Sequence, residues 1–185
     1  MDARRTVIRL DAGNTRVAFS VRWFGVVFVR GSFADIAGTL EVPGARDEDA
    51  SLAVQVDSHS VNTGIGLRDR HLRGLRFLDS ARHPTIRFVS TGVSRNNGVW
   101  DVKGRLSLRG KEREVDITVR DERVSNLQRK LTAEFSVPRR PHSIGTAAGL
   151  RRLNPLLWAI GDDVTLSLEV LVPATMLAAE HAPAR

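Results

Sequence analysis

The chain has 185 residues, of which 42% are hydrophobic and 26% charged, and its formal net charge is +7. This length suits one domain with a sizeable core, and the composition argues against a chain that is disordered throughout. Cysteine is absent, which excludes disulfides, thiolate catalysis and cysteine-bound zinc.

The first residues do not resemble a targeting signal. A secretory leader needs an uninterrupted apolar run of about 7–15 residues after its basic start, and none follows Arg4 and Arg5. The most apolar stretch, 21–29, contains Arg22 and is shorter than the roughly 20 residues that span a bilayer. We therefore expect a soluble, cytoplasmic protein without a transmembrane segment.

Apolar residues alternate with polar ones along most of the chain, which is typical of strands with one buried face. Eight segments follow this period of two: 17–23, 27–33, 52–56, 86–88, 100–108, 115–119, 131–137 and 164–170. Turn signals separate them at Pro43-Gly44, at Asn96-Asn97-Gly98 and at Gly110. Short, evenly spaced strands of this kind predict an all-β sandwich or barrel.

One segment has helical spacing instead. Apolar positions between 67 and 78 recur every three or four residues, with Thr63 as a plausible N-cap and Gly74 as a weak point. Pro84 favours an extended restart into the next strand. We predict one short helix or helical turn here.

Residues 138–161 form a second irregular stretch, with three prolines and two arginine pairs, Arg139-Arg140 and Arg151-Arg152. Loops of this length are usually functional or mobile. The alanine-rich tail, 173–185, is expected to be frayed or to form a short helix.

Aromatic side chains occur on most of the predicted strands. They either pack an ordinary core or line a cavity, because an eight-stranded barrel can be filled by side chains or can hold one small ligand. The side chains expected to line the barrel are Phe19, Trp23, Val29, Phe33, Val54, Phe88, Trp100, Phe135 and Leu166. Trp158 completes the aromatic set.

Arginine supplies nearly all the positive charge, since the chain has only three lysines. Arginine matches phosphate geometry, so Arg68 and His71 in the helical segment, with Arg139 and Arg140 in the loop, are candidates for binding an anionic head group. The alternatives are a solvated helix face, with Asp69 and Asp79 pairing locally, and a mobile surface loop. The predominance of arginine can also reflect a GC-rich genome alone.

Catalytic and metal-binding patterns are not evident. Asp57-Ser58-His59-Ser60 contains the residue types of a catalytic triad, but neighbours in sequence do not make triad geometry. His59, His71 and His83 are twelve residues apart, which matches no metal-ligand spacing. We expect no enzyme activity, no metal site and no cofactor.

Three segments together resemble the YceI-like family. Residues 27–33 resemble its early V-x-G-x-F strand, and residues 104–111 resemble its G-x-L-x-L-x-G strand and turn. Between them, the longest block matches at Thr63, Arg68, Asp69, His71, Leu72, Phe77, Asp79, Pro84, Ile86 and Phe88.

The resemblance implies an extended, lipocalin-like antiparallel β-barrel of about eight strands, with one short helix over one end. It implies a single domain over 1–172, followed by the 173–185 tail. It also implies a polyisoprenoid or other long-chain lipid as ligand, and often a homodimer. Many members are exported, whereas this chain shows no leader.

Two segments depart from the family pattern. The family usually has histidine where this chain has Trp23, before Phe24-Gly25. It usually shows R-x-x-F-G where Arg139 is followed by Arg140, Pro141, His142 and Ser143. Both differences bear on the ligand more than on the fold.

We therefore expect a protein that sequesters or carries a long apolar amphiphile, either a polyisoprenoid or a fatty-acid-like lipid, inside its barrel. One alternative is a filled, ligand-free barrel acting as a stress or scaffold protein. Another is binding of nucleic acid or an anionic surface by the arginine loop. We rank nucleic acid lower, because few exposed aromatic residues for base stacking are evident.

Overall fold

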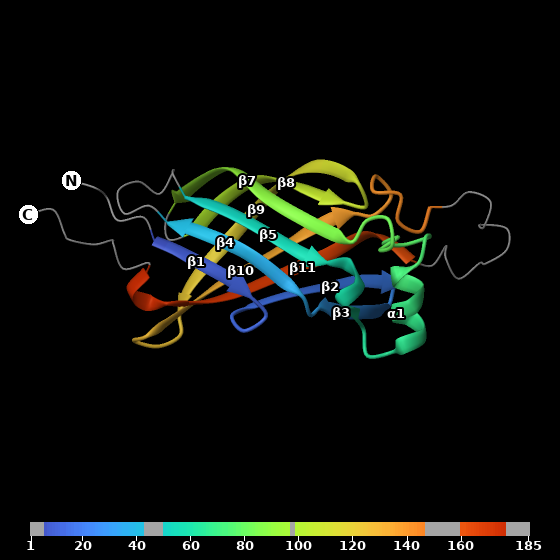
Figure 1. The fold of residues 1–185 in the computed structure, drawn as a ribbon, viewed down its shortest axis with the longest axis horizontal. Coiled ribbons are helices and arrows are strands. Elements are labelled where there is room, and N and C mark those ends of the chain that lie inside the picture. The colour runs from blue at the N-terminus through green and yellow to red at the C-terminus, as the bar shows by residue number, and fades with distance from the viewer. Residues whose placement is uncertain (1–5, 43–49, 97–98, 147–159, 177–185) are drawn as a thin grey trace, which may run out of the picture.

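The computed structural model describes residues 6–42, 50–96, 99–146 and 160–176. Over these residues one curled antiparallel sheet forms a long half-barrel, and a single α-helix, α1 (Gly66–Arg73), lies at one end of it (Figure 1). The predicted all-β architecture with one short helix is confirmed at this level.

Eleven strands make up the sheet, in the spatial order β1-β4-β5-β7-β8-β9-β10-β11-β2-β3-β6. They are β1 (Thr6–Asp11), β2 (Thr15–Trp23), β3 (Val27–Phe33), β4 (Ile36–Val42), β5 (Ser51–Asp57), β6 (Val61–Asn62), β7 (Thr85–Asn96), β8 (Val99–Leu108), β9 (Lys111–Arg123), β10 (Gln128–Pro138) and β11 (Ile160–Pro173). A 3-10 turn, Ser58–Ser60, joins β5 to β6, and β6 pairs with β3. This pairing places β3 beside the segment that enters α1.

The expected number of about eight strands is wrong, because β1, β4 and β6 were not recognised. In β1 only Ile8 and Leu10 are buried, which gives too short an alternation to stand out. In β4 the inward row is interrupted at Gly38, where an added Cβ would lie 2.4 Å from the carbonyl oxygen of Ala53. The third missed strand, β6, has two residues and is too short to show any period.

The predicted hairpins at two of the turns are present. Asn96 pairs with Val99 across the β7–β8 turn. Arg109 and Gly110 both have positive φ, 52° and 68°, between β8 and β9, as a two-residue hairpin turn requires. The Pro43-Gly44 turn lies outside the described residues.

The helix is shorter than the predicted segment 67–78. It ends at Arg73 because Gly74 has extended backbone angles, φ −70° and ψ 166°. The predicted N-cap is also wrong: Ile65 occupies that position without a side-chain hydrogen bond. Thr63 instead donates both its N–H and its hydroxyl to the buried carboxylate of Asp69.

The half of the interior remote from α1 is packed. Its side chains are Ile8, Leu10, Val93, Trp100, Val102, Leu131, Ala133, Val170 and Val172, all buried. They come from β1 and from the ends of β7, β8, β10 and β11 that lie away from α1 (Figure 1). This half therefore supplies a conventional hydrophobic core.

Candidate functional site

A cavity of about 850 Å³ occupies the other half of the interior, under α1. Its walls are mainly apolar side chains of β2, β3, β5 and β7–β11. Of the side chains predicted to line the barrel, eight do so: Phe19, Trp23, Val29, Phe33, Val54, Phe88, Phe135 and Leu166. Their contact with a ligand stays a prediction. The volume lies within the range of about 300–1,000 Å³ that is usual for ligand pockets.

Inward-facing residues around this cavity are only partly covered by protein. Phe19, Phe135 and Leu166 pack against the core, yet each is only half-buried. Trp100 in the packed half is 8% exposed by contrast. Since well-packed interiors leave few voids larger than a water molecule, the exposed surface of the cavity walls marks space that side chains do not fill.

Trp100, the ninth predicted lining residue, is not among the residues that line the cavity. It lies in the packed half, with the guanidinium carbon of Arg95 4.8 Å from its ring centroid. Asp121, whose side chain is 1% exposed, pairs with Arg129 at 2.7 Å and with Arg95 at 4.0 Å. Trp100 and this ion-pair network therefore belong to the closed end of the half-barrel.

The end of the cavity under α1 opens to solvent. Arg70, His71, Leu75 and Arg76 are exposed and also line the cavity, so they form its rim. Arg68 lines it too, but its Nε and Nη2 donate to the hydroxyl and carbonyl oxygens of Thr63. Of the predicted head-group residues, Arg68 and His71 thus lie at the mouth.

Arg139 has a different environment from the one expected of a solvent-facing anion ligand. It is 5% exposed, and its guanidinium donates to the carbonyl oxygens of Gly161, Ile144, Gly145 and Ile160. It lines the cavity while tying the loop after β10 to the start of β11.

Arg140 is not among the residues that line the cavity, and it pairs with Asp162 at 3.3 Å on an exposed surface. Such exposed pairs contribute little stability, typically about 0–1 kcal/mol. The other arginine pair of this loop, Arg151-Arg152, and the aromatic Trp158 lie outside the described residues.

Sequence inspection missed Arg109, which links three parts of the open end. From the β8–β9 turn its guanidinium donates to the carbonyl oxygens of Ser143 and Leu75. The N–H of Gly145 donates in turn to the carbonyl of Arg76. Arginine beside a turn glycine carries no signal of such a role, because both acceptors are backbone atoms 34 residues away in the chain.

His142 and Ser143, where the chain departs from the family pattern, lie in the loop after β10. His142 is 1% exposed and its Nδ1 lies 3.2 Å from the carbonyl oxygen of Leu108. Burial lowers its pKa below the ordinary value of 6.5, aided by the charge of Arg113 and opposed by the Leu108 hydrogen bond. Ser143 has a φ of +59°, a conformation that favours glycine.

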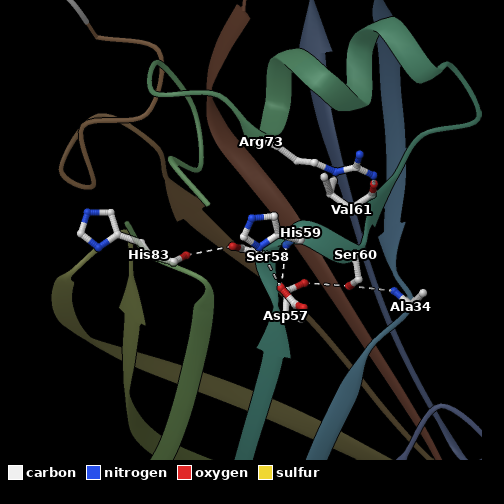
Figure 2. Close-up of polar contacts among 8 residues, drawn as sticks. All are labelled: Ala34, Asp57, Ser58, His59, Ser60, Val61, Arg73 and His83. Atoms are coloured by element: carbon white, nitrogen blue, oxygen red, sulfur yellow. Dashed lines mark hydrogen bonds and ion pairs between the residues drawn. The ribbon is translucent and has the colours of Figure 1, made fainter. Parts of the chain in front are cut away.

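The triad-like segment 57–60 forms local structural contacts (Figure 2). The Ser58 hydroxyl is buried and donates to the carbonyl of His83, while the Ser60 hydroxyl donates to the carbonyl of Asp57. His59 pairs with Asp57, at 3.3 Å. Neither serine hydroxyl donates to the imidazole in this arrangement, and the segment closes the turn between β5 and β6.

Metal-binding groups and membrane-spanning helices are both absent from the described part of the chain. No group of three or more histidine, cysteine, aspartate or glutamate side chains could hold a metal ion there. No helix in those ranges has the length and apolar character needed to cross a membrane.

A curled antiparallel sheet with an apolar cavity at one end places the chain in the class of barrel-like β proteins with an internal pocket. The YceI-like domain profile matches residues 9–172. The chain belongs to the YceI-like family, as the resemblance predicted.

Relatives in several bacteria are UPF0312 proteins. One from Azotobacter vinelandii is 34% identical over 115 residues, which is 62% of this chain and 60% of the relative. One from Pectobacterium atrosepticum is 28% identical over 138 residues, or 72% of each chain. The matched part thus spans less than two thirds of the Azotobacter protein.

Solved structures share the fold at low identity. Burkholderia cenocepacia BcnA superposes with a TM-score of 0.77 at 17% identity, over 88% of this chain and 99% of the other. A Saccharophagus degradans protein, described as a polyisoprenoid binding domain implicated in plant cell wall breakdown, gives 0.68 at 16% identity, over 91% and 98%. These likenesses establish the fold alone.

Proposed function

We propose that the protein binds a long apolar amphiphile, a polyisoprenoid or a fatty-acid-like lipid, with the apolar tail inside the cavity. The observation that carries the proposal is the unfilled, apolar volume of about 850 Å³ under α1. Membership of the YceI-like family and the polyisoprenoid-binding description of the Saccharophagus protein support it.

The energetics favour a long chain as the guest. Burying one methylene contributes about 0.8 kcal/mol, so a five-carbon unit contributes up to about 4 kcal/mol. Association itself costs roughly 4–15 kcal/mol. Several units must therefore be buried before binding becomes tight, and small volatile molecules offer too little surface.

The rim supplies guanidinium groups and an imidazole for the polar end of such a guest. Arg70, His71 and Arg76 are exposed where they border the cavity, and Arg68 lies just inside. A phosphate or carboxylate held there would keep its charge in water while the tail is dry. Arg139 has its donors on backbone carbonyls, so we assign it to holding the loop in place.

The two alternative functions have less support. A filled, ligand-free barrel requires inward side chains that meet, whereas Phe19, Phe135 and Leu166 leave surface on the cavity. Binding of nucleic acid or another anionic surface by the arginine loop depends partly on Arg151-Arg152, outside the described residues. A cytoplasmic location and a homodimer stay predictions.

The test combines native mass spectrometry with a cavity-filling variant. Purified protein should carry a lipid-sized adduct that solvent extraction removes, and the stripped protein should take up a fluorescent prenyl probe. Leu166→Trp should fold but lose most uptake, because the indole occupies the cavity. Thr118→Trp, at an exposed position of β9, is the matched control and should bind as the wild type does. A clean apo mass together with no probe uptake would contradict the proposal.

A further inference from the structure

Exposed apolar side chains gather at the open end of the half-barrel. Of the ten large hydrophobic residues that are exposed in the described ranges, seven belong to the β2–β3 hairpin or to the α1 region. These seven, called here the apolar rim, are Phe24, Val26, Val27, Phe28, Ile65, Leu67 and Leu75. The hairpin and α1 lie at the same end of the molecule (Figure 1), since β3 pairs with β6.

The hairpin tip is unusual for a surface turn. Residues 24–28 read Phe-Gly-Val-Val-Phe, and Val26 is 79% exposed. Tips of solvated hairpins normally carry polar or glycine-rich turn residues. A run of exposed apolar residues at such a tip therefore indicates a functional surface. The tip residues Phe24, Val26, Val27 and Phe28 lie outside the cavity lining, so the cavity does not explain their exposure.

The segments that carry the apolar rim are rich in arginine. Segments 22–30 and 63–78 contain Arg22, Arg30, Arg68, Arg70, Arg73 and Arg76, against a single carboxylate, Asp69. Asp69 is 7% exposed and accepts hydrogen bonds from Thr63. The guanidinium carbons of Arg22 and Arg30 lie 5.5 and 5.8 Å from the ring centroid of Phe28. Apolar tips among arginines match the boundary between acyl chains and anionic head groups.

We propose that the open end docks on an anionic lipid bilayer, with the apolar rim inserted at the head-group boundary and the cavity mouth facing the membrane. An isologous contact with a second copy would place the same cationic surface against itself, which like-charge repulsion opposes. The inference deepens the proposed function, because a membrane-facing mouth lets a lipid pass between bilayer and cavity without crossing water.

Vesicle co-sedimentation of the full chain tests the docking directly. The wild type should sediment with vesicles of equal parts phosphatidylglycerol and phosphatidylcholine, weakly with phosphatidylcholine alone, and less as salt rises. The double variant Val26→Ser/Phe28→Ser should bind roughly tenfold more weakly, because two inserted apolar side chains are lost. Val124→Ser/Leu127→Ser is the matched control. Its residues are 55% and 76% exposed in another hairpin, at the opposite end, and binding should be unchanged.

Parallel uptake of a free prenyl probe separates this inference from the proposed function. The hairpin variant should take up the probe as the wild type does, since neither residue lines the cavity. If the wild type takes up the probe but does not sediment with anionic vesicles, the docking is overturned and the ligand proposal stands. If it sediments but takes up no probe, the ligand proposal is overturned and the docking stands. Docking is also overturned if the hairpin variant sediments with the vesicles as the wild type does. If sedimentation velocity then shows a smaller assembly for the variant than for the wild type, the apolar rim is a self-association surface instead.

Discussion

Ser143 shows how a single residue records a departure from the family pattern. Its φ of +59° lies in the left-handed region, which costs a residue with a side chain about 1–3 kcal/mol. The family motif usually has glycine at this position. The loop keeps its geometry because Arg109 binds the Ser143 carbonyl and Arg139 binds the carbonyls that follow.

Replacing this serine with glycine should therefore stabilise the protein. We expect Ser143→Gly to raise the free energy of unfolding by about 1 kcal/mol, because glycine adopts positive φ without strain. Urea unfolding at neutral pH measures the change. Ser136→Gly, at an exposed position within β10, should have the opposite sign, so equal shifts in both variants would refute the explanation.

His142 makes stability depend on pH at the residue scale. Burial lowers its folded-state pKa below 6.5, so the unfolded chain binds the proton more readily. The free energy of unfolding should be highest above pH 6.5 and fall as the pH drops from there toward the folded-state pKa. His142→Phe should flatten this part of the profile in urea unfolding at several pH values.

At the scale of elements, the ion-pair network of Asp121 holds β7, β9 and β10 together away from the cavity. Asp121→Asn would remove the carboxylate charge that pairs with both Arg95 and Arg129. Breaking a fully buried ion pair costs about 3–5 kcal/mol. Since the two arginine side chains are 20% and 24% exposed, we expect Asp121→Asn to lower the free energy of unfolding by less, about 2–3 kcal/mol. Thermal unfolding measures it, with the exposed Asp116→Asn of β9 as control. Equal melting temperatures for the two variants would exclude the network as a stabilising feature.

The elements that sequence predicted were those with long, regular alternation. In β8 and β10 every second residue is buried over much of the strand. In β11 every second residue from Val164 to Leu168 lines the cavity. This long alternation is visible in the sequence and identifies the three strands. By contrast, α1 ends early because Gly74 takes extended angles. Whether a glycine weakens a helix or ends it depends on packing that a single sequence does not display.

The side chains that face the interior were easier to predict than the presence and position of an unfilled cavity. Inward residues follow from alternation, which is why eight of nine predicted positions border the cavity. Trp100 shares the same inward pattern but sits in the packed half. The difference arises from which strands converge at each end of the molecule, and residue types alone do not encode it. Arg139 illustrates the same limit, since it donates to the backbone carbonyls of Gly161, Ile144, Gly145 and Ile160, which residue types do not reveal.

For the whole molecule, an unfilled cavity predicts a dependence of stability on bound lipid. A ligand that binds only the folded state stabilises it by about 2.7 kcal/mol at a hundred times its dissociation constant. Solvent-stripped protein should therefore melt at a lower temperature than protein as purified, and adding a long-chain prenyl alcohol should restore the melting temperature. Leu166→Trp is the control and should respond little to the alcohol. Equal melting of stripped and untreated wild type, with no response to added alcohol, would contradict this.

The packed half beyond the cavity turns the pocket into a dead end. A chain-like guest that enters beside α1 meets the side chains around Trp100 and cannot thread through to the far side. Depth, rather than width, then decides how much of a guest is sheltered, and any excess length stays outside with the polar terminus. The depth of the pocket would then select ligands by chain length, and enlarging the pocket at its blind end should shift the binding preference toward longer ligands.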